Sequence, residues 1–176
     1  FGVTCGANSV NMLEGLNGLS VGLSLIISFG VLLMIDFSEN FQHTNFLFFP
    51  FFGSLVAFFI FNKYPSSIFP GDVGTFFIGS TLVVLAYSSN LIVEMVLMMI
   101  LFILEFFIKL RGSFQAQNFG EITDSGYLTY NSKLQSLTHF FMYKGRYTEL
   151  GILLRFYLLQ LSIVLIVLIL KKINLI

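Results

Sequence analysis

One acidic residue, Asp72, lies in a loop whose neighbours suit the binding of phosphate and metal ions. The segment reads NKYPSSIFPGDVGT, in which Pro65 and Pro70 stiffen the chain and Gly71 permits unusual backbone angles. A carboxylate beside the N–H groups of a helix start can hold Mg²⁺ while those N–H groups face phosphate oxygens. Because Mg²⁺ takes one or two protein carboxylates together with substrate phosphates, one Asp suffices. The alternative is that Asp72 caps the helix that follows.

Side-chain amides gather in a second polar segment near the start of the chain, which reads GANSVNMLEGLNGLSVG. If residues 7–14 form a helix, Asn8, Asn11 and Gly15 share one face, because they are three and four residues apart. An amide offers the donor and the acceptor needed to read a nucleobase edge, and a glycine lets a ligand approach the backbone. The alternative is that these residues only cap and turn the chain.

The composition is that of a membrane protein. Of the 176 residues, 56% are hydrophobic and 10% are charged, whereas about a quarter are charged in soluble domains. Nine basic and nine acidic residues give a formal net charge of zero, which leaves no basic surface for nucleic acid. The single cysteine, Cys5, excludes an internal disulfide and a site built from several thiolates.

Five apolar stretches approach the about 20 residues that a helix needs to cross a bilayer. They are residues 19–35, 46–61, 73–87, 91–108 and 150–170. We therefore expect an all-α fold, a polytopic membrane bundle of about five transmembrane helices that forms one membrane domain over residues 1–176. Because the chain opens with Phe1, we also expect it to be a piece of a longer protein.

Basic residues predict which connections face the cytoplasm. The 36–45 connection has no Lys or Arg, whereas the 62–72 and 109–149 connections carry Lys63, Lys109, Arg111, Lys133, Lys144 and Arg146. We expect these two loops and residues 1–18 to be cytoplasmic, although Lys171 and Lys172 at the other end run against the rule. Chemistry is then expected on the cytoplasmic side.

Ionisable residues within the spans are costly and therefore need partners or access to water. We expect a Glu105–Arg155 pair and a Glu94 side chain that reaches the membrane interface. In the 109–149 loop, His139 precedes Phe140, so it is either part of a site or a polar residue at the edge of an interfacial helix. Neither a Ser-His-Asp nor a Cys-His pattern is evident.

As a pair, the spacings Asn-x-x-Asn-(x)5-Asn-Gly and Tyr-Pro-(x)4-Pro-Gly-Asp resemble the C-terminal half of the polyprenyl-phosphate N-acetylhexosamine-1-phosphate transferase superfamily. That superfamily includes the eukaryotic dolichyl-phosphate GlcNAc-phosphotransferase and the bacterial phospho-MurNAc-pentapeptide translocase. The later runs NFGEITDSGYL, SLTHFFM and GRYTE are similar to archaeal members.

The resemblance implies roles for individual residues. Asp72 and Asn11 are expected to be catalytic and to bind Mg²⁺. Nucleotide-binding residues are expected at Asn8, Gly15, Asn17, Arg111 and His139. The family has a basic or histidine-rich signature in its last cytoplasmic loop, and this sequence has Gln115, Ala116 and Gln117 near that place. Arg111 and His139 are expected to substitute for it. Glu14 stands where bacterial members have Asp and eukaryotic members have Ala. The family's Asp-Asp motif is absent from this sequence, so we expect half of an enzyme, inactive alone.

The resemblance also implies a function: Mg²⁺-dependent transfer of GlcNAc-1-phosphate or a close relative from a UDP-sugar to polyprenyl or dolichyl phosphate, with release of UMP. Such a transferase serves protein glycosylation or cell-envelope biosynthesis. It is integral to the cell membrane, or to the endoplasmic reticulum membrane in a eukaryote, and its active site faces the cytoplasm. The sequence does not decide whether it forms a homodimer. The alternative is a non-catalytic membrane module or half of a transporter, with a polar path lined by Asn11 and Asp72.

Overall fold

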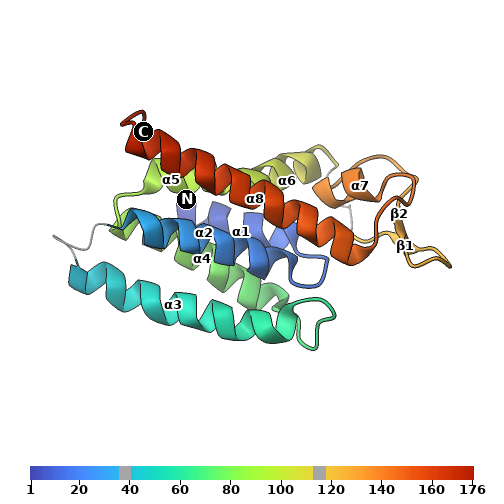
Figure 1. Cartoon of the computed structure of the whole chain (residues 1–176), viewed down its shortest axis with the longest axis horizontal. Coiled ribbons are helices and arrows are strands. Elements are labelled where there is room, and N and C mark those ends of the chain that lie inside the picture. The colour runs from blue at the N-terminus through green and yellow to red at the C-terminus, as the bar shows by residue number, and fades with distance from the viewer. Residues whose placement is uncertain (36–40, 113–117) are drawn as a thin grey trace.

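The computed structural model describes residues 1–35, 41–112 and 118–176, and most of them are helical (Figure 1). The helices are α1 (Gly2–Leu13), α2 (Leu19–Met34), α3 (Phe41–Asn62), α4 (Gly71–Ser88), α5 (Ile92–Met98), α6 (Ile100–Arg111), α7 (Leu137–Met142) and α8 (Glu149–Lys172). Two short antiparallel strands, β1 (Glu121–Ile122) and β2 (Leu128–Thr129), form a hairpin between α6 and α7. The predicted helical architecture is confirmed for these residues, apart from the short hairpin.

Helices occupy all five predicted spans, and the fourth is divided into α5 and α6 at Met99. The division has a local cause, because the Gln160 side chain on α8 donates a hydrogen bond of 2.9 Å to the Met98 carbonyl. Within the described residues, α4 and α8 are long and apolar enough to cross a membrane, and α2 and residues 46–62 form shorter apolar helices. The bundle fits a membrane protein, and five crossings remain a prediction.

The first polar segment forms a helix that is packed within the bundle, a position that the sequence analysis did not predict. Helix α1 packs along α4 and α6, with Val10 and Leu13 fully buried. A Cβ atom added at Gly79 would lie 2.3 Å from the Gly6 carbonyl oxygen, so α1 and α4 approach as only glycines allow. The predicted helix over residues 7–14 begins earlier and ends at Leu13. Gly15 therefore lies beyond the helix and does not share a face with Asn8 and Asn11.

The main core lies along α2, which is buried on nearly all sides against α3, α4 and α8. Leu23, Ile27 and Val31 are fully buried there. A Cβ atom at Gly22 would clash with the Tyr157 ring, which shows how closely α2 and α8 pack. Membrane helices gain stability from such close contact, because small residues let the backbones approach.

The α1–α2 connection, the α3–α4 connection and the α7–hairpin region lie at the same end of the bundle (Figure 1). Hydrogen bonds join them: Asn17 in the first connection contacts Ser66 in the second, and Asn118 contacts the backbone at Glu14. The three segments that the sequence places on one side therefore meet in the fold.

The predicted Glu105–Arg155 pair is wrong, and Glu94 has a partner that the sequence analysis did not predict. Glu94 is buried and forms an ion pair with Lys171 at the far end of α8. The Glu94 carboxylate also explains why Lys171 lies at the end of the bundle where the distribution of basic residues predicts no cation. Glu105 accepts a hydrogen bond of 2.7 Å from the Leu137 backbone N–H. Arg155 instead lies 3.5 Å above the Tyr147 ring, so it does not pair with Glu105.

Candidate functional site

Asp72 is the second residue of α4 and lies in its first turn. Gly71 begins the helix with a φ of +57°, a conformation that favours glycine, and Pro70 occupies the N-cap position. Asp72 is therefore not the N-cap residue, which removes the capping alternative. Its side chain is exposed, and no hydrogen bond or ion pair joins its carboxylate to another described residue. The carboxylate is thus available to a ligand.

Asn11 is held beside the start of α4 by Thr75. The Thr75 hydroxyl donates a hydrogen bond of 2.7 Å to Asn11 Oδ1, and the same hydroxyl lies 3.1 Å from the Asp72 carbonyl oxygen. Thr75 is fully buried, so this contact is sheltered from water. The structure thus brings two of the predicted site residues, Asn11 and Asp72, to the same pair of helix turns.

The oxygen donors at this place suit a hard cation such as Mg²⁺. Asp72 supplies a carboxylate, and the Asn11 carbonyl keeps a lone pair after accepting from Thr75. No cluster of three His, Cys, Asp or Glu side chains occurs among the described residues. A closed metal site of the zinc type is thus not formed by them, whereas Mg²⁺ requires few protein ligands when phosphates supply the others.

Asn17 cross-links three segments. Its backbone N–H donates to Glu149 Oε1 at 2.8 Å, and its side-chain amide donates to the same oxygen. Its Oδ1 accepts from both the backbone N–H and the hydroxyl of Ser66. Glu149 begins α8 and Ser66 lies in the α3–α4 connection, so neither contact can be read from local sequence. The two donors from Ser66 occupy both lone pairs of Oδ1, so the Asn17 amide keeps one N–H for a nucleobase and can accept from one only if Ser66 is displaced. The nucleotide-binding role of Asn17 remains a prediction.

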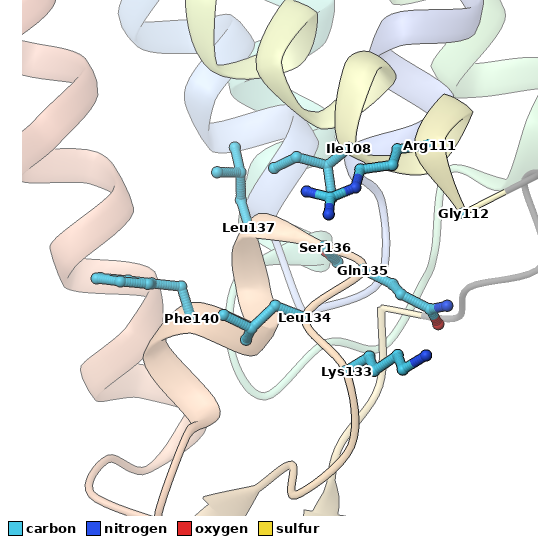
Figure 2. A pocket seen from close by; sticks show the side chains of 9 residues that line it. All are labelled: Ile108, Arg111, Gly112, Lys133, Leu134, Gln135, Ser136, Leu137 and Phe140. Carbon is cyan, nitrogen blue, oxygen red and sulfur yellow. The ribbon is translucent and has the colours of Figure 1, made fainter.

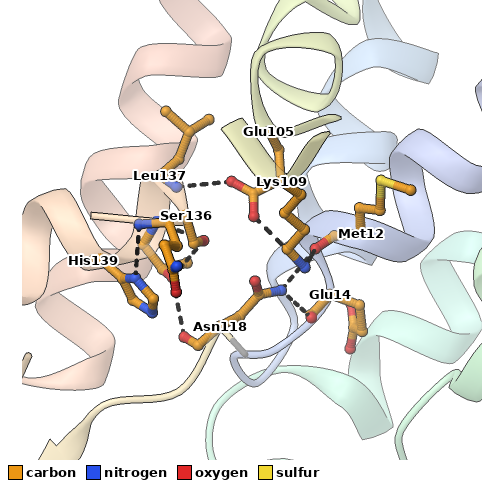
Figure 3. A network of polar contacts seen from close by, with 10 residues as sticks. Met12, Glu14, Glu105, Lys109, Asn118, Ser136, Leu137 and His139 are labelled. Carbon is orange, nitrogen blue, oxygen red and sulfur yellow. Dashed lines mark hydrogen bonds and ion pairs between the residues drawn. The ribbon is translucent and has the colours of Figure 1, made fainter. Parts of the chain in front are cut away.

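Gly15 permits the close approach of another side chain of this chain, and its contact with a nucleotide remains a prediction. A Cβ atom at Gly15 would lie 2.4 Å from the Asn118 Cβ atom. The Asn118 amide donates to the carbonyl oxygens of Met12 and Glu14, while its own backbone carbonyl accepts from Thr138 at 3.0 Å (Figure 3). Asn118 therefore fastens the long loop to the end of α1, a role that sequence reasoning missed.

A buried ion pair continues this network toward α7. Lys109 lies 3.7 Å from Glu105 and donates to the Met12 carbonyl at the C-terminal end of α1 (Figure 3). A cation is favourable there, because the last carbonyls of a helix carry partial negative charge. Glu105 in turn accepts from the Leu137 backbone N–H. The ends of α1, α6 and α7 are thus joined by charged hydrogen bonds.

Glu14 follows the last residue of α1 and is partly buried. Its carboxylate accepts a hydrogen bond from the Ser20 hydroxyl, and its second oxygen is buried without a partner among the described residues. Burial raises the pKa of the Glu14 carboxyl, and the hydrogen bonds from Ser20 partly oppose the rise. The environment therefore favours the protonated form more than water does.

The structure does not support direct nucleotide contact by His139. Its side chain is fully buried, its ring stacks on Tyr130 with centroids 3.5 Å apart, and its Nδ1 accepts from the Gln135 backbone N–H at 3.4 Å. The physical reason is that the hairpin folds over α7 and supplies Tyr130 as a stacking partner, which the sequence does not reveal. The alternative, that His139 lies at the edge of an interfacial helix, remains a prediction.

The other predicted nucleotide ligands are dispersed. Arg111 lines a pocket with Lys133, Gln135 and neighbouring residues, and none of Asn11, Asn17 or Asp72 lines it. The Asn8 amide donates to the Thr4 carbonyl at 2.8 Å. Residues 115–117, where the family's basic signature is replaced, lie outside the described residues.

Comparison with known proteins identifies the family. The sequence model of glycosyl transferase family 4 matches residues 1–90. A protein of Saccharolobus solfataricus named as a UDP-N-acetylglucosamine–dolichyl-phosphate N-acetylglucosaminephosphotransferase is 38% identical over 151 residues, covering 85% of this chain and 47% of the relative.

A protein of the same name from Sulfolobus acidocaldarius is 35% identical, covering 86% of this chain and 47% of the relative. A phospho-N-acetylmuramoyl-pentapeptide-transferase of Vesicomyosocius okutanii is 30% identical, covering 94% and 47% respectively. The chain spans about half the length of these curated relatives. The matched region contains Asn11, Asn17 and Asp72, and the chain therefore belongs to glycosyl transferase family 4.

Proposed function

We propose that the protein containing this chain transfers N-acetylglucosamine-1-phosphate from UDP-N-acetylglucosamine to dolichyl phosphate or a related polyprenyl phosphate. An oxygen of the lipid phosphate attacks the sugar-proximal phosphorus of the donor. A new P–O bond forms, the bond from that phosphorus to the bridging oxygen breaks, and the bridging oxygen leaves with UMP. The names of the two archaeal relatives support this donor and acceptor.

The hydrogen bond from Thr75 to Asn11 is the observation that carries the proposal. It draws a side-chain carbonyl from α1 to the helix start that presents the Asp72 carboxylate. A diphosphate needs opposite charge and oriented dipoles where its own charge develops during phosphoryl transfer. The exposed N-terminal N–H groups of α4 supply such dipoles, because the first turn of a helix leaves them unpaired.

Asp72 and Asn11 are the residues that would hold Mg²⁺. Bound there, the ion would offset the negative charge that builds on the donor diphosphate as the bridging bond breaks. Asp72 keeps its carboxylate turned to solvent, and Thr75 fixes the orientation of the Asn11 carbonyl. Further carboxylates would come from the part of the relatives' length that this chain does not span.

The connection over residues 14–18 would position the nucleotide. Asn17 ties it to Ser66 and Glu149, and Asn118 ties its first residue to the long loop. A loop held at both ends loses little further conformational entropy when a ligand binds. This arrangement supports donor binding beside Asn11 and Asp72, with Asn17 as a positioning residue.

The proposal includes a membrane topology. The helices at the five apolar stretches would cross the bilayer, and α1 would pack between the helices of this bundle. The 109–149 loop and the two connections that it contacts would face the cytoplasm, where UDP-sugars are available.

The full-length gene product, incubated with UDP-N-acetylglucosamine, Mg²⁺ and dolichyl phosphate, tests the function. We expect UMP and lipid-linked N-acetylglucosamine diphosphate in equal amounts, and neither product when the lipid phosphate is omitted or Mg²⁺ is chelated. A transporter half or a non-catalytic module would release no UMP. UMP formation that does not require the lipid phosphate would contradict the proposed acceptor.

A further inference from the structure

A pocket of about 720 Å³ opens between the end of α6 and the segment that leads into α7 (Figure 2). Its lining comes from Ile108, Arg111 and Gly112 on one side and from residues 133–137 with Phe140 on the other. This volume is within the range of small-molecule sites. None of the residues proposed for metal or donor binding at α4 lines it.

Two cations face this pocket. Arg111 and Lys133 stand on opposite walls, with the amide of Gln135 nearby (Figure 2). Neither cation forms an ion pair within the described residues, and none of the described lining residues carries a carboxylate. Glu105 lies behind the wall, but Leu137 and Lys109 occupy its carboxylate. The pocket therefore has a net positive charge that a phosphate group would neutralise.

Four of the remaining lining residues are large and apolar, and two of them are exposed. Phe140 is 68% exposed and Leu134 is 55% exposed, and they lie beside Ile108 and Leu137. Large apolar side chains in this number are unfavourable in water. On a chain whose composition fits a membrane protein, they indicate contact with hydrocarbon, and the two cations then lie at the level of the head groups.

We propose that this pocket binds the head group of an anionic membrane phospholipid, with the phosphate between Arg111 and Lys133. The acyl chains would follow Ile108, Leu137 and Phe140 into the bilayer. The bound lipid would brace the end of α6 against α7, next to the network that fixes the end of α1. The site is distinct from the proposed catalytic site, so its occupancy is measured without reference to transfer activity.

Native mass spectrometry of the full-length protein, titrated separately with phosphatidylglycerol and phosphatidylcholine, tests the proposal. We expect tighter binding of phosphatidylglycerol, and a loss of at least about tenfold in that affinity for the double variant Arg111→Gln, Lys133→Gln. The charge-conserving variant Arg111→Lys, Lys133→Arg should retain most of the affinity. The matched control is Lys144→Gln, Arg146→Gln, which removes two exposed cations of the same loop outside the pocket.

A second variant, Phe140→Gln, keeps both charges and should also weaken phosphatidylglycerol binding, so the test does not depend on the double variant folding. Equal losses in the control pair would indicate general surface attraction and overturn the proposal. Competition by inorganic phosphate as effective as that by phosphatidylglycerol would assign the pocket to a free anion. Stoichiometric displacement by polyprenyl phosphate would make it a substrate site, which also contradicts the proposal.

Discussion

The Thr75 hydroxyl donates a hydrogen bond of 2.7 Å to Asn11 Oδ1, across the contact between α4 and α1. Thr75 is fully buried, whereas Asp72, three residues earlier on α4, is exposed. The first turn of α4 therefore combines a buried hydroxyl that holds Asn11 in place with an exposed carboxylate that is available to a ligand.

Thr75→Val should lower kcat by about tenfold with little change in fold, because it removes a buried hydrogen bond and keeps the side-chain shape. Steady-state UMP release measures the effect. Thr75→Ser retains the hydroxyl and should restore most of the rate. If Thr75→Val and Thr75→Ser are equally impaired, packing of the methyl group matters and the hydrogen bond does not.

Asp72→Asn should abolish transfer while the protein remains folded, because the amide lacks the charge that attracts Mg²⁺. The matched control is Asp124→Asn, which alters an exposed Asp in the β-hairpin and should keep normal activity. Both variants are compared at saturating Mg²⁺. Activity of Asp72→Asn within about tenfold of wild type would exclude Asp72 as a metal ligand.

Asn17→Leu should weaken binding of the UDP-sugar, at a cost of about 1–3 kcal/mol for the polar groups left unpaired. Because the Asn17 amide contacts Glu149, we expect Glu149→Gln to have an overlapping effect, so that the double variant is little worse than Asn17→Leu alone. Isothermal titration with the donor measures all three. Strictly additive losses would indicate that Asn17 reads the nucleotide directly, and an unchanged affinity would remove it from the site.

Local sequence predicts the helices well, because long apolar stretches bounded by polar residues leave few other structures for a backbone in a membrane. The same reasoning places Asp72 at the start of a helix. It did not predict that α1 packs inside the bundle, where Gly6 lies against Gly79 of α4 and Ser9 is buried. Small residues at a helix contact carry little hydropathy signal, so the sequence does not reveal such packing.

Most of the contacts that shape the site were beyond sequence reasoning. Glu149 binds Asn17 from a position 132 residues away, and Asn118 packs against Gly15 from the long loop. No spacing rule links residues so far apart. Thr75 is the exception, because a hydroxyl one turn after Asp72 on a predicted helix could have been proposed from sequence.

Stability should fall as pH rises above about 4.5, the ordinary pKa of a Glu carboxyl, because burial raises the pKa of Glu14 in the folded state. Between the unfolded and folded pKa values, the folded protein binds more protons than the unfolded chain does, so raising the pH favours unfolding. Glu14→Gln should flatten this part of the profile of Tm against pH. The control Glu121→Gln removes an exposed carboxyl and should leave the slope unchanged; an equal slope in Glu14→Gln would assign the effect to another group.

The two ends of the bundle should face opposite sides of the membrane. Ser132 lies in the long loop, and Leu175 follows α8 near the Glu94–Lys171 pair; both are exposed. In a Cys5→Ser background freed of other cysteines, a cysteine at Ser132 should react with an impermeant thiol reagent only after the cytoplasmic face is opened. A cysteine at Leu175 should react in intact cells.

Labelling of the Ser132 position from outside would show that the long loop is extracellular. Asp72 and Asn11 would then also be on the outer side, because hydrogen bonds of Asn118 and Asn17 tie the long loop and the two connections to the same end of the bundle. The proposed transfer reaction would then have no donor on the required side.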